Sequence, residues 1–304
     1  MGRDLYEQVP QAREIFTLAD RAVRFPLSEL IFEGPAQLLQ QTINAQPAIA
    51  TVSLAALAAL QAALPVPLQP VCTAGHSLGE YTALVPAGAL AWTDAIALIA
   101  VRARLMQRAS EQQPGGMVAI LGLDETALHE VCRQVRAEVP GSFVTVANIN
   151  CPGQIVLAGD HAGLARAQEL AATRGARRAI PLPVSGAFHS EAMRAVADRL
   201  AERIQAAPIR QAEVPIIANV TALPLTEPAE IRRELAEQLY SPVRWEACVR
   251  TMLAAGVRTF VELGPGQVLA GLIRRTDPSA EVFNVGSVEE AERVAAALAA
   301  RLSG

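Results

Sequence analysis

One stretch of the sequence decides the expected fold: Val71-Cys72-Thr73-Ala74-Gly75-His76-Ser77-Leu78-Gly79. An apolar run at 71–74 enters a GxSxG pentapeptide at 75–79, and a segment of helical character follows. Glycines on both sides of Ser77 allow a sharp strand-to-helix turn that leaves the hydroxyl group exposed. The stretch predicts a serine nucleophile, with the backbone amide of Leu78 as an oxyanion donor at the helix N-terminus. The alternative is an ordinary turn in which Ser77 only caps the helix.

Downstream of this motif, the periodicity from 117 to 184 indicates a separate unit. We expect strands at 117–121, 143–147, 154–158 and 176–181, and helices at 124–138 and 161–173. The resulting order, β-α-β-β-α-β, is that of the split βαβ or ferredoxin-like arrangement.

On both sides of this unit the pattern is that of a larger α/β domain. Helices are expected at 3–20, 35–42 and 48–64 before the serine motif; after the unit, helices at 190–206, 228–238, 243–255, 267–275 and 288–302 alternate with strands at 214–218, 259–263 and 282–285. Such alternation favours a parallel sheet with helices on both faces. The predicted fold class is therefore α/β, with a core formed by residues 1–114 and 185–304, an insert at 115–184, and a cleft between them.

Composition excludes several classes of protein. The 304 residues are 51% hydrophobic, enough for a large core, and the net charge of -4 with no long run of like charge argues against a nucleic-acid partner. The four cysteines form no CxxC pair, so neither a disulfide framework nor a metal site is predicted. The apolar segment 48–64 falls short of the roughly 20 residues that span a bilayer. We expect a buried helix there, no membrane association, and a cytoplasmic location.

Arg102 gives the first indication of a substrate. In the helix expected from a cap at Thr93, its neighbours three and four positions away are Leu98, Ile99, Leu105 and Met106, whereas Arg104, Arg108 and Glu111 lie on the opposite stripe. A guanidinium on an apolar stripe requires an anion, and its planar fork suits a carboxylate. The residues alone leave two options open: a substrate carboxylate, or a structural ion pair with a core Asp or Glu.

Histidines offer a base for Ser77. His189 precedes the helix expected after Ser190, where the N-terminal dipole disfavours the imidazolium and leaves a neutral base. A histidine that only packs at the start of a helix is the alternative. His76 either lines the site or packs beneath it, and packing is the favoured interpretation. His129 and His161 are expected on the surface of the insert.

Two further segments are less informative. The turn Glu262-Leu263-Gly264-Pro265-Gly266-Gln267 lacks the spacing of nucleotide-binding loops and is interpreted as structural. The basic residues Arg174, Arg177 and Arg178 either meet an acidic partner or a cofactor phosphate, or form a solvated surface.

Taken in order, several motifs resemble those of the malonyl-CoA:acyl carrier protein transacylase family over essentially the whole chain. They are Gly75-His76-Ser77-Leu78-Gly79-Glu80-Tyr81, Arg102, Asn150-Cys151-Pro152-Gly153-Gln154, Gly186-Ala187-Phe188-His189-Ser190 and Glu262-Leu263-Gly264-Pro265-Gly266. The resemblance implies a hydrolase-like core with a ferredoxin-like insert. It also implies malonyl-CoA as substrate, acyl carrier protein as partner, and no bound cofactor, in fatty acid or polyketide synthesis.

The resemblance also assigns roles by position. Ser77 would carry the malonyl ester, His189 would act as base and then acid, Arg102 would clamp the malonate, and the Leu78 amide would be one oxyanion donor. The family holds its histidine with backbone carbonyls, so no acidic triad member is expected. His76, Asn150 and Phe188 are candidate pocket residues. Leu78 and the Ala-Phe-His sequence at 187–189 resemble the malonyl-selective pattern of polyketide synthase acyltransferase domains.

Two departures from the family pattern stand out. The family begins with an apolar strand and a GQGSQ-type loop that supplies a second oxyanion donor, and loss of such a donor costs about 10²- to 10³-fold in rate. We expect natural expression to start upstream of the segment 1–6; the alternative is an impaired form. Arg244 stands where some members have glutamine, and it is assigned no catalytic part.

Two other functions remain open at this point. A serine thioesterase or hydrolase would use water in place of the second thiol. A catalytically silent module would bind the carrier protein without reacting.

Overall fold

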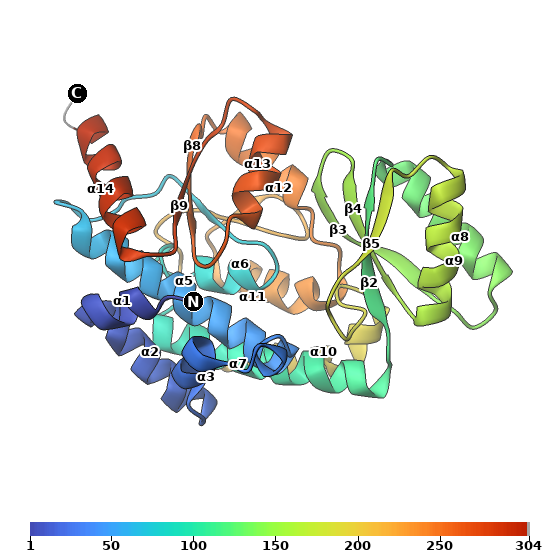
Figure 1. Cartoon of the computed structure of the whole chain (residues 1–304), viewed down its shortest axis with the longest axis horizontal. Helices are drawn as coiled ribbons and strands as arrows, with labels where there is room; N and C mark the ends of the chain where they lie inside the picture. Colours follow the sequence, from blue (N-terminus) through green and yellow to red (C-terminus); the bar gives the residue numbers. More distant parts are fainter. Residues whose placement is uncertain (303–304) are drawn as a thin grey trace.

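Strands fall into three separate sheets in the computed structural model, which describes residues 1–302. The largest has four strands: β2 (Gly116–Leu121), β3 (Val144–Cys151), β4 (Gln154–Gly159) and β5 (Arg178–Pro181). Their spatial order is β3-β4-β2-β5, and every neighbouring pair is antiparallel. Two helices, α8 (Glu125–Glu138) and α9 (His161–Thr173), cover the outer face of this sheet (Figure 1). The expected β-α-β-β-α-β order is therefore present.

This four-stranded unit has a buried cluster of its own. Its members all come from residues 118–171, and Leu128, Val131, Val144 and Leu157 are fully buried. Asp124 and Asp160 cap the two helices through side-chain bonds to the amides of Ala127 and Gly163. The hydrophobic periodicity and the helix caps indicate the same elements here. This agreement explains why the sequence predicted them well.

The N-terminal helices differ from their predicted bounds. They are α1 (Arg3–Gln8), α2 (Pro10–Val23), α3 (Leu27–Glu33), α4 (Ala36–Leu39) and α5 (Thr42–Ala63). The single helix expected at 3–20 is wrong, because Val9 is extended and Pro10 starts a new helix at its first position. Helix α3 was not predicted. Helix α5 has 22 residues rather than the shorter span expected, so its length and composition would allow it to cross a membrane, but 67% of its apolar window is buried within the protein.

The strands of the larger domain are shorter and more divided than expected. Strand β1 (Thr73–Ala74) is parallel to β6 (Ile216–Ile217), which pairs antiparallel with the unpredicted β7 (Pro224–Leu225). Strands β8 (Thr259–Leu263) and β9 (Glu281–Val285) form a second parallel pair. The single parallel sheet expected for this domain is therefore wrong: its parallel strands form two pairs in separate sheets, one of which also has an antiparallel strand.

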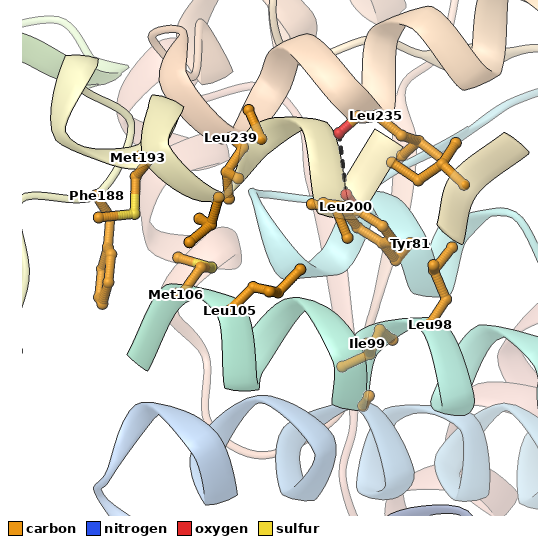
Figure 2. Close-up of a cluster of buried hydrophobic side chains, with 14 of the residues drawn as sticks. Tyr81, Leu98, Ile99, Leu105, Met106, Phe188, Met193, Leu200, Leu235 and Leu239 are labelled. Atoms are coloured by element: carbon orange, nitrogen blue, oxygen red, sulfur yellow. Dashed lines mark hydrogen bonds between the residues drawn. The ribbon is translucent and has the colours of Figure 1, made fainter. Parts of the chain in front are cut away.

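Helices surround these short strands. They are α6 (Leu78–Ala83), α7 (Trp92–Gln112), α10 (Arg194–Ala206) after the 3₁₀ turn η1 (Glu191–Met193), α11 (Pro228–Glu237) with η2 (Gln238–Tyr240), α12 (Trp245–Ala254), α13 (Val268–Thr276) and α14 (Val288–Leu302). Helix α7 begins after Ala91, so the predicted cap at Thr93 is wrong. Figure 2 shows the inward stripe of α7 facing Tyr81, Leu200, Leu235 and Leu239. This cluster fixes the helix that carries Arg102.

Backbone pairing joins the four-stranded unit to the rest of the chain. The amide of Ile149 donates to the Val243 carbonyl at 2.9 Å, and the Val243 amide donates to the Ala147 carbonyl at 2.9 Å. Arg275 adds a side-chain bond to Gln154 at 2.7 Å. These contacts place the end of β3 beside the turn that contains Ser77.

Candidate active site

Ser77 occupies a sharp turn between β1 and α6. Its backbone has φ 52° and ψ −103°, a conformation with positive φ that costs of order 1–3 kcal/mol in a residue other than glycine. The turn is tight because Gly75 approaches Gly79, and a Cβ atom at Gly75 would lie 2.0 Å from the Gly79 carbonyl carbon. Gly75 is therefore required by geometry, as the sequence predicted, whereas a Cβ atom at Gly79 would meet no atom within 4 Å.

Asn219, which follows the neighbouring strand β6, braces this turn. Its Oδ1 accepts from the Ser77 amide at 2.7 Å, and its Nδ2 donates to the Gly75 carbonyl at 2.8 Å. Asn219 is fully buried. No sequence pattern indicated this residue, since it belongs to no motif and lies 142 residues from Ser77.

His189 lies against the serine hydroxyl. Ser77 Oγ is 2.7 Å from His189 Nε2, while Nδ1 is 2.8 Å from the backbone carbonyl of Gln238. A carbonyl can only accept, so Nδ1 carries the hydrogen and Nε2 is free to accept from Ser77. The structure thus brings together the two residues that the sequence singled out, with a carbonyl where a triad acid would stand.

Burial controls the protonation of His189. Its side chain is almost fully buried, and desolvation, followed by the positive charge of Arg102, lowers the pKa of His189 to about 3. The sequence predicted a neutral base because of a helix N-terminus. The neutral form is what the site favours, but the cause is burial and a neighbouring cation.

Arg102 donates hydrogen bonds only to neutral groups in this structure. Nη1 bonds Gln46 Oε1 at 2.6 Å, and Nη2 bonds Ser77 Oγ and Gln238 Oε1, both at 2.9 Å. The guanidinium also lies 5.2 Å from the centre of the Tyr81 ring. Within residues 1–302 no carboxylate forms an ion pair with it, although Arg102 is only 1% exposed. The core ion pair considered as the alternative is absent from this part of the chain.

The Leu78 amide is the first of α6 and so has no acceptor within its own helix. No other acceptor for it lies in the described chain, so it is available beside Ser77 to a ligand oxygen. This agrees with its expected place as an oxyanion donor.

The candidate pocket residues lie in two places. His76 Nε2 is 2.8 Å from Asn150 Oδ1, and the His76 ring packs 5.8 Å from the Trp245 ring, where burial lowers the pKa of His76. Phe188 is buried near Met193 in the apolar cluster (Figure 2). His76 therefore packs against Trp245 with Asn150 as its partner, and because it is half-buried beside Ser77, whether it also lines the site stays a prediction.

The remaining sequence candidates have structural or surface positions. Glu262 accepts from the amides of Leu269 and Ala270, both at 2.9 Å, and so caps α13. His129 and His161 are exposed, as expected. Arg174 bonds Gln134, and Arg177 and Arg178 are exposed. In the described chain no group of three His, Cys, Asp or Glu side chains could hold a metal ion.

Comparisons with known proteins point in one direction. The family model described as the acyl transferase domain matches residues 1–297. A relative from Bacillus subtilis (strain 168), named malonyl CoA-acyl carrier protein transacylase, is 48% identical over 292 residues, covering 96% of this chain and 90% of the relative.

Solved structures agree with this. The chain is similar to the malonyl CoA-acyl carrier protein transacylase from Coxiella burnetii, with a TM-score of 0.93 and 36% identity over 98% of this chain and 93% of that chain. It is also similar to a chain of a complex between a type II PKS acyl-carrier protein and its malonyl-transacylase, with a TM-score of 0.90 and 34% identity over 96% and 93% of the two chains.

Proposed function

Because the chain belongs to the acyl transferase domain family, we propose that it transfers a malonyl group from malonyl-CoA to the phosphopantetheine thiol of acyl carrier protein. A Ser77 ester would be the intermediate. The substrate and acceptor are those that the names of its relatives state.

One observation carries the choice of acyl group: Arg102 is a buried cation that forms no ion pair with a carboxylate of residues 1–302 and lies 2.9 Å from the serine hydroxyl. Burying an unpaired charge is costly, so the site favours an anion at this point. A malonyl thioester places a carboxylate two carbon–carbon bonds from its reactive carbonyl carbon. An anion held by the fork of Arg102 would keep that carbonyl beside Ser77.

The hydrogen bonds support a two-step acyl transfer. Ser77 Oγ attacks the thioester carbon as its proton passes to His189 Nε2, and the Leu78 amide stabilises the oxyanion. Collapse breaks the C–S bond, and His189 returns the proton to the coenzyme A thiolate. In the second step the carrier thiol gives its proton to His189 and attacks the ester, and the proton then returns to Ser77.

We propose the finer architecture on the same basis. The strand order β3-β4-β2-β5 with two covering helices supports a ferredoxin-like insert at 115–184. Residues 1–114 and 185–304 would then form the hydrolase-like core, supported by a serine turn that follows a short parallel strand. A cytoplasmic location stays a prediction.

A labelling experiment tests the activity. Protein mixed with malonyl-CoA should gain one malonyl group on Ser77, detected by peptide mass spectrometry, and added carrier protein should remove it. Loss of the adduct to water at the same rate without the carrier protein would favour the serine hydrolase. A folded protein that forms no adduct would favour the silent binding module.

Replacing Arg102 tests the acyl-group selection. Arg102→Ala should lower kcat/KM for malonyl-CoA by roughly 100-fold or more, because a desolvated charge partner is lost. The ratio of acetyl to malonyl transfer should rise. Arg104→Ala is the matched control, since Arg104 lies on the exposed stripe of the same helix. Unchanged acetyl-to-malonyl selectivity in Arg102→Ala would rule out the clamp.

A further inference from the structure

Glu80 lies on α6, three residues after Ser77, and its carboxyl group is buried, with 1% of the residue exposed. Its Oε2 accepts from the side-chain amide of Gln238 at 2.5 Å, and its Oε1 accepts from the backbone amide of Asn219 at 3.0 Å. Each oxygen thus holds a different segment of the chain. The acyl-transfer steps above do not use this group.

The two residues that Glu80 holds are those that shape the reacting pair. The Gln238 carbonyl accepts from His189, and its side chain accepts from Arg102 and donates to the Ser77 carbonyl at 2.8 Å. Asn219 braces the turn of Ser77 through two bonds. Both hydrogens of the Gln238 amide are used, one on Ser77 and one on Glu80, so its orientation is fully determined.

We propose that Glu80 is a positioning residue: by holding Gln238 and Asn219 together, it fixes the orientation of His189 and the conformation of Ser77. The inference rests on the proposed function only in taking Ser77 and His189 as the reacting pair. Glu80 contacts neither substrate nor reacting atoms. A carboxyl group suits this place because it offers two acceptor oxygens to two N–H donors, whereas an amide side chain offers one.

The charged surroundings explain how the group is tolerated. Burial, and then the carboxyl group of Glu234 on α11, raises the pKa of Glu80 well above its ordinary range. Burial also raises the pKa of Glu234, which accepts from the Val220 amide at 2.7 Å. Burial and the neighbouring carboxyl group thus both disfavour the ionised form of Glu80. The Gln238 side chain bonds both Glu80 and Arg102, and the Arg102 cation opposes part of the rise in the pKa of Glu80.

Three variants separate positioning from simple support of the fold. Glu80→Gln keeps the shape but turns an N–H group toward one of the two donors, so one bond is lost. Glu234→Gln removes the neighbouring acid and leaves both bonds of Glu80 in place. Glu230→Gln changes the charge of α11 at a residue without contact to the site and serves as the control. The midpoint of thermal unfolding is measured for each variant.

The readout is the rate at which a fluorophosphonate labels Ser77, which needs no malonyl recognition. Glu80→Gln should label roughly 10- to 100-fold more slowly, as expected for a misplaced reacting pair, while Glu234→Gln stays within about threefold of the native rate. With malonyl-CoA, kcat should fall more than KM rises. If Glu80→Gln does not fold, Glu80→Asp replaces it, and its labelling should still be slower than that of Glu234→Gln.

Native labelling by the Glu80 variants, or equal losses at Glu80 and Glu234, would overturn the proposal. Native protein that labels normally but takes no malonyl group would count against the proposed function and leave the positioning inference intact.

Discussion

At the scale of single residues, the environment of His189 is what makes Ser77 chemically useful. The imidazole is buried, accepts from the serine hydroxyl at 2.7 Å and donates to a carbonyl at 2.8 Å. Its pKa is lowered by burial and by Arg102 to about 3. The base is therefore neutral throughout the physiological range, and no acid is needed to orient it.

This shift predicts the dependence of activity on pH. Because the pKa of His189 in the folded state is about 3 rather than 6.5, the rate of Ser77 acylation should show no acid limb between pH 5 and 7. The measurement is acylation at fixed malonyl-CoA across that range. A limb centred at pH 6 to 7 would show that His189 titrates normally.

The lowered pKa of His189 also makes the free energy of unfolding depend on pH. Above pH 6.5 neither state is protonated at His189 and the full stability is present; as pH falls from 6.5 towards 3, only the unfolded state gains the proton and stability is lost. Between pH 7 and 5, His189→Asn should lose less unfolding free energy than the native protein, by up to about 2 kcal/mol. Denaturant titrations at the two pH values measure this difference.

At the scale of elements, the two helices of the four-stranded unit are each capped at the N-terminus by an aspartate. The two aspartates accept different numbers of hydrogen bonds. Asp124 accepts only from the Ala127 amide, at 2.8 Å. Asp160 accepts from the Gly163 amide at 2.9 Å, the Phe143 amide at 2.6 Å and the Ser142 hydroxyl at 2.5 Å. Asp160 therefore joins the start of α9 to the start of β3, whereas Asp124 serves one helix.

Removing the two caps should have unequal effects. Asp124→Ala should lower the free energy of unfolding by about 1 kcal/mol, as for an ordinary N-cap. Asp160→Ala should cost about 2 kcal/mol or more, because two further hydrogen-bond donors lose their acceptor. Denaturant unfolding of the two variants provides the comparison, and equal losses would show that the additional bonds of Asp160 contribute little.

At the scale of the whole molecule, the buried clusters follow the division seen in Figure 1 only in part, because one cluster packs residues of β2, β3 and β4 against α7 and α10. One cluster lies wholly within the four-stranded unit, and another joins the N-terminal helices to α14 and β9. Backbone pairing between β3 and Val243 connects the unit to the core. The site residues come mostly from the core, and Asn150 reaches His76 from the end of β3.

This division predicts which part of the chain a cavity would destabilise. Leu157→Ala and Leu60→Ala each remove a fully buried side chain, and each should cost about 3 kcal/mol. Leu157→Ala should raise amide hydrogen exchange mainly within residues 116–181, and Leu60→Ala mainly in α2, α5 and α14. Indistinguishable exchange maps from the two variants would indicate a single cooperative unit.

The sequence by itself determined the features that depend on neighbours along the chain. Gly75 allowed the close approach in the serine turn, and α9, β8 and α14 were predicted at their observed bounds. The apolar stripe of α7 placed Arg102 inside, because side chains three and four positions apart share a helix face. The predicted bounds of helices were wrong where a single residue interrupts a periodic segment, as Pro10 does.

Only the tertiary structure decided how the site is held. Asn219, Gln238 and Gln46 belong to no motif, and the bond from the Gln238 side chain to the Ser77 carbonyl spans 161 residues of sequence. The absence of an ion pair between Arg102 and a carboxylate of the described chain is likewise a result of packing. Hydrogen bonds between distant segments depend on where the folded chain places each donor and acceptor. Local sequence periodicity does not predict that placement.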